Sequence, residues 1–191
     1  MTSALDKTAL RQRMRELRPR LAAEADNAGA RAAWHLPLNR LPAFEAAAVY
    51  YAQGSESDPT PLAQRLIAEG RTAALPVARS RDGRLQFRRW TPGETLEPDA
   101  VGVPSPPAAQ PLVTPQLVVV PLLAFDRHGG RLGQGGGHYD RTLAELRAKG
   151  AVFVLGLAYA GQLVDEIPME PHDQPLDAVL TEVGYIALRR D

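Results

Sequence analysis

Residues 117–141, which read LVVVPLLAFDRHGGRLGQGGGHYDR, constrain the fold more than any other part of the chain. They begin with an apolar run of the length of a buried strand and continue through a loop that contains six glycines. A helix is predicted from about residue 138 to residue 148, with Tyr139, Leu143 and Leu146 on its inward face. A buried strand joined by a loop to a helix is the unit from which parallel α/β sheets are built.

Further apolar segments of strand length alternate with helical segments along the chain. Strands are predicted at residues 46–52, 72–76, 117–120, 153–157, 178–180 and 185–187. A half-exposed strand is predicted where Leu85 and Phe87 alternate with polar neighbours, and helices are predicted at about 24–36 and 61–69. This alternation predicts an α/β fold, with a largely parallel sheet flanked by helices in a Rossmann-like three-layer architecture. Residues 1–191 are expected to form a single domain.

An amphipathic helix is predicted at the amino terminus, beginning near Thr2 or Ser3. Its apolar stripe follows helical spacing and consists of Leu10, Met14, Leu17 and Leu21. Its other face is basic, with Arg11, Arg13, Arg15 and Arg18, and such a run of arginines is usually no more than a solvated face. Residues 98–115 contain six prolines, which predicts an ordered loop without regular structure.

Composition excludes several classes of function. The 191 residues include 22 basic and 22 acidic side chains, so the chain lacks the positive charge of a dedicated nucleic-acid-binding protein. The absence of cysteine excludes disulfides, thiolate zinc sites and a cysteine nucleophile, and the 4 histidines show no metal-ligand spacing. The apolar runs are about half the roughly 18 residues of a membrane span, and residues 1–20 do not read as a secretory signal. We therefore expect a cytoplasmic protein without a membrane or nucleic-acid partner.

The glycines make residues 129–137 a candidate anion-binding loop. Glycine adopts positive φ and exposes backbone N–H groups to a ligand, and the following helix N-terminus adds free donors. Arg131 adds a charge-assisted contact that suits a polyphosphate. The loop lacks the lysine of a P-loop, and His138 stands where a dinucleotide fingerprint has its third glycine. A flexible connection whose glycines serve tight turns is the alternative interpretation.

Five segments, in order, resemble motifs of the 5-formyltetrahydrofolate cyclo-ligase family, also called methenyltetrahydrofolate synthetases. The loop signature is carried by Phe125-Asp126, Gly129, Arg131-Leu132-Gly133, Gly135, Gly137 and Tyr139-Asp140-Arg141. The other matching segments are Lys7 with Leu10 and Arg11, Ser55-Glu56 with Asp58, Gly102-Val103-Pro104 with Pro106, and His172-Asp173 with Asp177. Two positions depart from the pattern. His138 stands where the family often has an aromatic residue, and Ser105 stands where it has a glutamate.

The resemblance implies an enzyme that uses ATP and Mg²⁺ to convert 5-formyltetrahydrofolate into 5,10-methenyltetrahydrofolate, with release of ADP and phosphate. The implied route phosphorylates the formyl oxygen, and the second folate amine then attacks this imino-phosphate. Arg131 and Asp140 are the implied catalytic residues. The implied ATP-binding residues are Lys7, Arg11, Arg131, Gly133, Gln134, Gly135, Gly136, Gly137 and Tyr139.

The resemblance also implies Asp140 and Asp173 as Mg²⁺ ligands, and Glu56 as an acceptor for pterin donors beside an apolar wall formed by Tyr51. Purely structural alternatives remain for all four: stabilisation of a first helical turn by Asp140, a turn at Asp173, a loop carboxylate at Glu56 and a core tyrosine at Tyr51.

Two other classes of function remain open. One is a sugar-phosphate isomerase or acyl-transfer enzyme whose glycine loop holds a single phosphate, and the other is a non-catalytic nucleotide-binding module. A monomer is expected for the cyclo-ligase.

Overall fold

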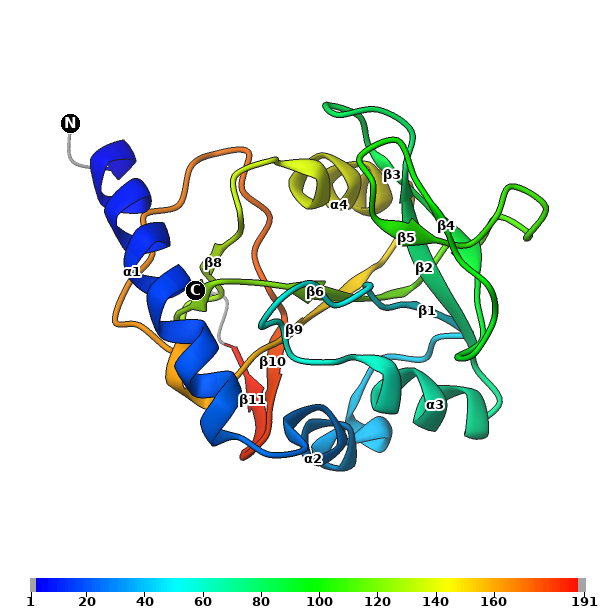
Figure 1. Ribbon diagram of the computed structural model, residues 1–191, viewed down its shortest axis with the longest axis horizontal. Helices are drawn as coiled ribbons and strands as arrows, with labels where there is room; N and C mark the ends of the chain where they lie inside the picture. Colours follow the sequence, from blue (N-terminus) through cyan, green and yellow to red (C-terminus); the bar gives the residue numbers. More distant parts are fainter. Residues whose placement is uncertain (1–2, 189–191) are drawn as a thin grey trace.

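The computed structural model describes residues 3–188, with side chains from Lys7 onward. Seven strands form one sheet in the order β11-β10-β9-β6-β1-β2-β3 (Figure 1). The central strands are parallel: β1 (Ala46–Ala48), β2 (Thr72–Ala78), β6 (Leu117–Pro121), β9 (Phe153–Leu157) and β10 (Ala178–Thr181). The edge strands β3 (Leu85–Arg89) and β11 (Gly184–Ala187) are antiparallel to their neighbours. The predicted α/β sheet is confirmed.

Helices cover both faces of the sheet. Helices α2 (Ala28–His35) and α3 (Thr60–Ala68) lie on one face, and α4 (His138–Lys149) lies on the other (Figure 1). In β6, Leu117 and Val119 join the core under α2 and α3, whereas Val118 and Val120 join the core under α4. Because both faces are buried, the central strands read as continuous apolar runs. The three layers confirm the predicted architecture.

Helix α1 (Ser3–Glu24) stands beside the sheet, where Met14 packs in a separate small core (Figure 1). The partners of Met14 lie on and beside a two-stranded hairpin, β7 (Ala124–Phe125) and β8 (Arg131–Leu132). The predicted apolar stripe is correct, whereas Thr2 lies outside the described residues. The expectation that Arg18 is solvated is wrong, because only 8% of this residue is exposed.

Several predicted boundaries differ from the structure. Strand β1 ends at Ala48 rather than at residue 52, because the chain bends away after the Val49 N–H bonds to the Ala74 carbonyl (2.9 Å). The second helix begins at Ala28 because Asn27 takes a left-handed φ of 54°. The proline-rich segment contains one short pair, β4 (Glu97–Pro98) and β5 (Pro104–Ser105).

The remaining helical turns are short. They are the 3₁₀ helices η1 (Leu38–Arg40) and η2 (Ala160–Gln162). Within residues 3–188, no helix combines the length and the apolar character needed to cross a bilayer.

The carboxylate of Asp126 anchors the turn between β7 and β8. It is 2% exposed and accepts backbone N–H groups from His128 (2.9 Å), Gly130 (2.8 Å) and Ile167 (2.8 Å). Gly130 is required here, because a Cβ at this position would lie 2.3 Å from Asp126 Oδ2. Asp126 therefore ties the start of the glycine loop to the chain segment that follows β9.

We predict that Asp126→Ala lowers the free energy of unfolding by at least about 2 kcal/mol, because the N–H groups of Gly130 and Ile167 are buried and each costs about 1–3 kcal/mol when left unpaired. Urea unfolding measures this loss, and Asp82→Ala, at an exposed aspartate, is the control. A loss below about 1 kcal/mol would show that water or local rearrangement replaces the carboxylate.

Candidate active site

One cavity of about 410 Å³ opens beyond the carboxyl ends of the parallel strands. Its walls come from α1, the loop after β1, the end of β2, the β4–β5 hairpin, the glycine loop, the start of α4 and the segment around residue 173. All of the predicted site residues line it: Lys7, Arg11, Tyr51, Glu56, Arg131, Gly133, Gln134, Gly135, Gly136, Gly137, Tyr139, Asp140 and Asp173. A switch point at this end of an α/β sheet is the usual place for a ligand.

The second half of the glycine loop, residues 133–137, lies between α1 and α4. Arg11 Nε donates to the Gly133 carbonyl (3.1 Å), and Arg15 bonds both to the side chain of Gln134 (3.1 Å) and to its carbonyl (3.2 Å). Gly137 takes a φ of 67° and leads directly into α4. The loop therefore brings the amino end of a helix, where backbone N–H groups lack helical partners, to the cavity wall.

Arg131 and Asp140 form a partly buried ion pair at the base of this loop. Arg131 Nη2 lies 2.7 Å from Asp140 Oδ1, which also accepts the Gln174 N–H (3.0 Å). Arg131 is 8% exposed, and its Nε has no hydrogen-bond partner among the described residues. The pair thus places a carboxylate beside a guanidinium that still has one unpaired N–H, and both side chains line the cavity.

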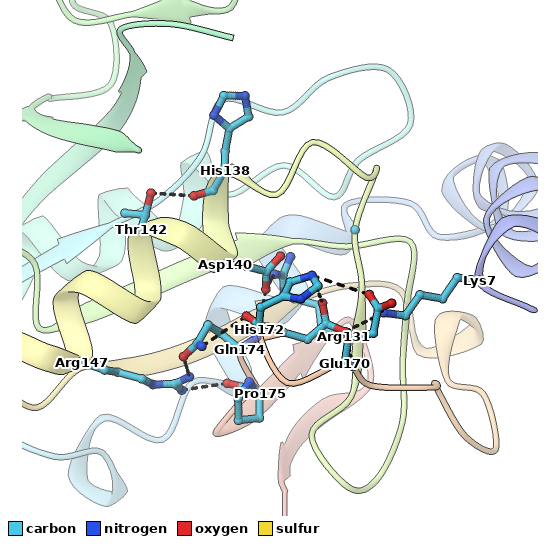
Figure 2. Close-up of polar contacts among 12 residues, drawn as sticks. Lys7, Arg131, His138, Asp140, Thr142, Arg147, Glu170, His172, Gln174 and Pro175 are labelled. Atoms are coloured by element: carbon cyan, nitrogen blue, oxygen red, sulfur yellow. Dashed lines mark hydrogen bonds and ion pairs between the residues drawn. The ribbon is translucent and has the colours of Figure 1, made fainter. Parts of the chain in front are cut away.

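Lys7 lies opposite, on α1, and reaches the acidic segment near the carboxyl terminus (Figure 2). Its Nζ lies 2.6 Å from Asp173 Oδ2 and 3.0 Å from Glu170 Oε2. Burial alone would lower the pKa of Lys7, but its hydrogen bonds to Asp173 and Glu170 outweigh burial and raise that pKa. Burial opposes ionisation of Asp173 too, yet the bond from Lys7 lowers the pKa of this carboxyl.

The structure changes the set of candidate cation ligands. Among the described residues, Glu170, His172 and Asp173 bring one ligand atom each within 4.8 Å of one another, and Asp140 is not in this group. Asp140 is joined to it through Gln174, the residue after Asp173. Arg147 of α4 holds this connection by donating to the Gln174 side chain (2.9 Å) and to the Pro175 carbonyl (2.8 Å) (Figure 2).

Tyr51 and Glu56 also line the cavity, from the loop after β1. Tyr51 is 41% exposed, which excludes the alternative of a core tyrosine. Glu56 Oε2 accepts the Gln53 N–H (2.9 Å), and its Oε1 lies 3.5 Å from Arg18 Nη1. Burial raises the pKa of Glu56, whereas the Gln53 N–H and the charge of Arg18 lower it.

The two departures from the family pattern have different surroundings. His138 lines the cavity, and its Nδ1 lies 2.9 Å from the Gly83 carbonyl, so it fixes the turn before β3. Ser105 is buried, and its Oγ donates to the Glu97 carbonyl (3.2 Å) within the β4–β5 hairpin. The hairpin instead presents Asp99 to the cavity, where Asp99 Oδ2 accepts the Ala78 N–H (2.8 Å).

Sequence reasoning missed Arg18, Glu170 and Asp99 as cavity residues. Arg18 could have been found, because it lies eleven residues after Lys7, which is close to three helical turns and so on the same face. Asp99 and Glu170 carry no comparable signal, since each stands in an irregular segment whose path depends on the rest of the fold.

Comparison with known proteins gives a consistent result. The family model described as the 5-formyltetrahydrofolate cyclo-ligase family matches residues 3–182. The 5-formyltetrahydrofolate cyclo-ligase of Mycolicibacterium smegmatis is 38% identical over 149 residues, which cover 73% of this chain and 75% of that protein. The enzyme of the same name from Escherichia coli K12 is 34% identical over 178 residues, covering 90% and 96% respectively.

Two solved structures are similar over nearly the whole chain. The 5,10-methenyltetrahydrofolate synthetase of Aquifex aeolicus has a TM-score of 0.70 at 26% identity and covers 97% of this chain and 94% of its own. The synthetase of Mycoplasma pneumoniae has a TM-score of 0.69 at 23% identity, covers 93% and 99%, and shows likeness of fold.

We predict strong coupling between Lys7 and Asp173, because 7% and 14% of their side chains are exposed. A double-mutant cycle of Lys7→Met and Asp173→Asn, followed by urea unfolding, should give a coupling free energy of about 1–3 kcal/mol. The control pair is Lys149 and Glu145 on the surface of α4, for which we expect about 0.5 kcal/mol or less. Equal couplings in the two cycles would contradict the expectation that burial strengthens the Lys7–Asp173 pair.

Proposed function

The chain belongs to the 5-formyltetrahydrofolate cyclo-ligase family, whose reaction closes 5-formyltetrahydrofolate to 5,10-methenyltetrahydrofolate, and we propose that this chain drives the closure with ATP and Mg²⁺. A single cavity supports the proposal, because the glycine loop and the Tyr51–Glu56 loop both line it. Two substrates bound there would meet inside one enclosed volume.

The proposed chemistry activates a poor electrophile. The formyl oxygen attacks the terminal phosphorus of ATP, the bond from that phosphorus to the bridging oxygen breaks, and ADP leaves. The second folate amine then attacks the formyl carbon and loses its proton, and the bond from that carbon to the phosphorylated oxygen breaks, so that phosphate leaves and the methenyl bridge remains. Little covalent work falls to the protein, so its residues act by positioning and by neutralising charge.

The phosphates of ATP would lie against the glycine loop. Backbone N–H groups of residues 133–137 and the start of α4 supply donors, and Arg11 holds the loop from α1. Lys7 and Arg131 supply positive charge, which in the structure is balanced by Asp173 and Asp140. Phosphate oxygens would share these cations with the carboxylates, so the bound nucleotide meets a wall that is already charged and ordered.

The carboxylates fit a hard divalent cation. Mg²⁺ takes oxygen ligands, and Asp140 and Asp173 supply them beside the proposed phosphate site, with Glu170 close to Asp173. When bound, Mg²⁺ would offset the negative charge of the phosphates. Arg131 and Lys7 hold these two carboxylates in place.

Glu56 and Tyr51 would form the folate end of the cavity. Glu56 presents a carboxylate whose orientation is set by Gln53 and Arg18, and this carboxylate would accept hydrogen bonds from the N–H groups of the pterin. Tyr51 supplies exposed aromatic surface beside it.

The proposal extends to the state of the protein. We propose a cytoplasmic monomer in which the whole chain acts as one domain on small molecules, without nucleic acid or membrane as a partner. The formal net charge of zero supports the absence of a nucleic-acid partner.

The decisive experiment mixes purified protein with 5-formyltetrahydrofolate and Mg-ATP and follows the absorbance of the methenyl product. Turnover that requires both ATP and Mg²⁺ supports the proposal. Calorimetric titration adds a second reading, in which ATP should bind and NAD should not. A folded protein that binds NAD but gives no methenyl product would overturn the assignment.

We predict that Asp140→Asn reduces turnover by at least about 100-fold, equivalent to roughly 2.7 kcal/mol of activation barrier. The asparagine amide still accepts the Gln174 N–H and is compatible with the first turn of α4. It loses the negative charge that faces Arg131 and the cation. Steady-state rates at rising Mg²⁺ should recover part of the loss. Asp165→Asn, at an exposed aspartate, is the control, and a rate near wild type at low Mg²⁺ would exclude Asp140 as a ligand.

We predict that Glu56→Gln weakens folate binding far more than ATP binding, because a hydrogen bond to a charged group contributes about 1.5–3 kcal/mol. Calorimetric affinities for the two ligands measure the difference, and ATP is the internal control for folding of the cavity. Equal losses for both ligands would assign Glu56 to loop structure rather than to substrate recognition.

A further inference from the structure

Arg18 is the buried cation of the cavity that the family motifs leave without a role. Its Nε donates to Ser55 Oγ (3.1 Å), and its Nη1 lies 3.5 Å from the Leu122 carbonyl and 3.5 Å from Glu56 Oε1. These contacts join α1 to the loop after β1 and to the end of β6. A guanidinium held by three groups has one orientation, so Arg18 is fixed before any ligand arrives.

The two carboxylate oxygens of Glu56 have different partners. Oε2 accepts the N–H of Gln53, and the Glu56 N–H donates to the Gln53 carbonyl (3.1 Å), so one oxygen closes a local turn. Oε1 faces Arg18, and 10% of each of these two side chains is exposed. Arg18 therefore sets the direction of the oxygen that the turn leaves available.

Arg18 also supplies the charge that balances Glu56. Of the described residues, it is the cation whose charge acts on this carboxyl, and it opposes the effect of burial on the Glu56 pKa. Three phenols interact electrostatically with Glu56: Tyr50 after β1, Tyr139 on α4 and Tyr159 after β9. Burial raises the pKa of each phenol, so these groups stay neutral and add no charge near Glu56.

We propose that Arg18 is a positioning residue for the folate half of the reaction, holding the Glu56 carboxylate charged and aimed at the pterin. The inference rests on the function proposed above. It divides the basic residues of α1 between the two substrates. Lys7 and Arg11 serve the phosphate end, and Arg18, about 16 Å along the helix axis from Lys7, serves the folate end.

The test compares Arg18→Met, Arg18→Lys and the control Arg13→Met, which removes an exposed arginine from the same helix. For Arg18→Met we expect KM for 5-formyltetrahydrofolate to rise about tenfold or more, with KM for ATP within about twofold of wild type. Arg18→Lys keeps the charge and should recover part of the folate affinity. Thermal unfolding of each variant reports any loss of fold.

The pH profile separates positioning from simple structural support. Folate use should fall as pH drops through the Glu56 pKa, because a protonated carboxyl loses acceptor capacity. Without Arg18 the protonated form is favoured, so the acid limb of kcat/KM for folate should move to higher pH in Arg18→Met and move less in Arg18→Lys. In a Glu56→Gln background, Arg18→Met should add little to the folate KM, because the group through which it acts is gone.

Three outcomes would overturn the inference while leaving the function in place: equal rises in KM for both substrates, an unmoved acid limb, or additive effects of the two substitutions. Failure of wild-type protein to make methenyl product would instead overturn the function and the folate role of Arg18 with it. A ¹³C NMR titration of the Glu56 carboxyl tests the pairing of Arg18 with Glu56 without turnover. The Glu56 signal is assigned by its absence from the spectrum of Glu56→Gln. An unchanged titration in Arg18→Met would exclude that pairing.

Discussion

The buried carboxylate of Asp126 is the group on which two walls of the cavity depend, the glycine loop and the segment that contains Asp173. Through its bonds to Gly130 and Ile167 it fixes where the glycine loop starts and where the segment that leads to Asp173 begins. A carboxylate that accepts several backbone N–H groups is strongly held, and no water is needed to satisfy those donors. The glycine loop can therefore carry few side chains of its own and still present ordered N–H groups. The loop is therefore held by the bonds of Asp126 at its start rather than by side chains within the loop.

Sequence periodicity predicted the parts of the fold that rest on two-sided burial. Strand β9 and helix α4 appear almost at their predicted bounds, because a continuous apolar run and a clear helical stripe leave few alternatives. The bend after Val49 was not predictable, since it depends on the contact with the distant Ala74 carbonyl rather than on local propensity. Asn27 did carry a local signal, because asparagine adopts a left-handed φ more readily than most residues. The β4–β5 pair is too short to have a pattern at all.

The site was predicted through motif resemblance more than through chemistry. Glycines, Arg131 and Asp140 are close in sequence, so their joint position follows from one strand, one loop and one helix. Lys7, Glu56 and Asp173 come from remote segments, and their meeting depends on strand order, which residue patterns alone leave open. Arg18, in contrast, was not predicted as a site residue although it lines the cavity. A row of arginines on a helix is usually solvated, and burial of one member depends on what the helix packs against.

The contact between Lys7 and Asp173 joins residues 166 positions apart, so the cavity has no complete form in any shorter stretch of the chain. During synthesis, the strands of the sheet can pair as they emerge, but this wall of the cavity closes only after the segment with Glu170 and Asp173 has left the ribosome. Long-range closure of this kind is slow compared with local helix formation. A nucleotide that binds across this closure would favour the folded chain by mass action. Substrate supply would thus act on the lifetime of the protein as well as on its rate.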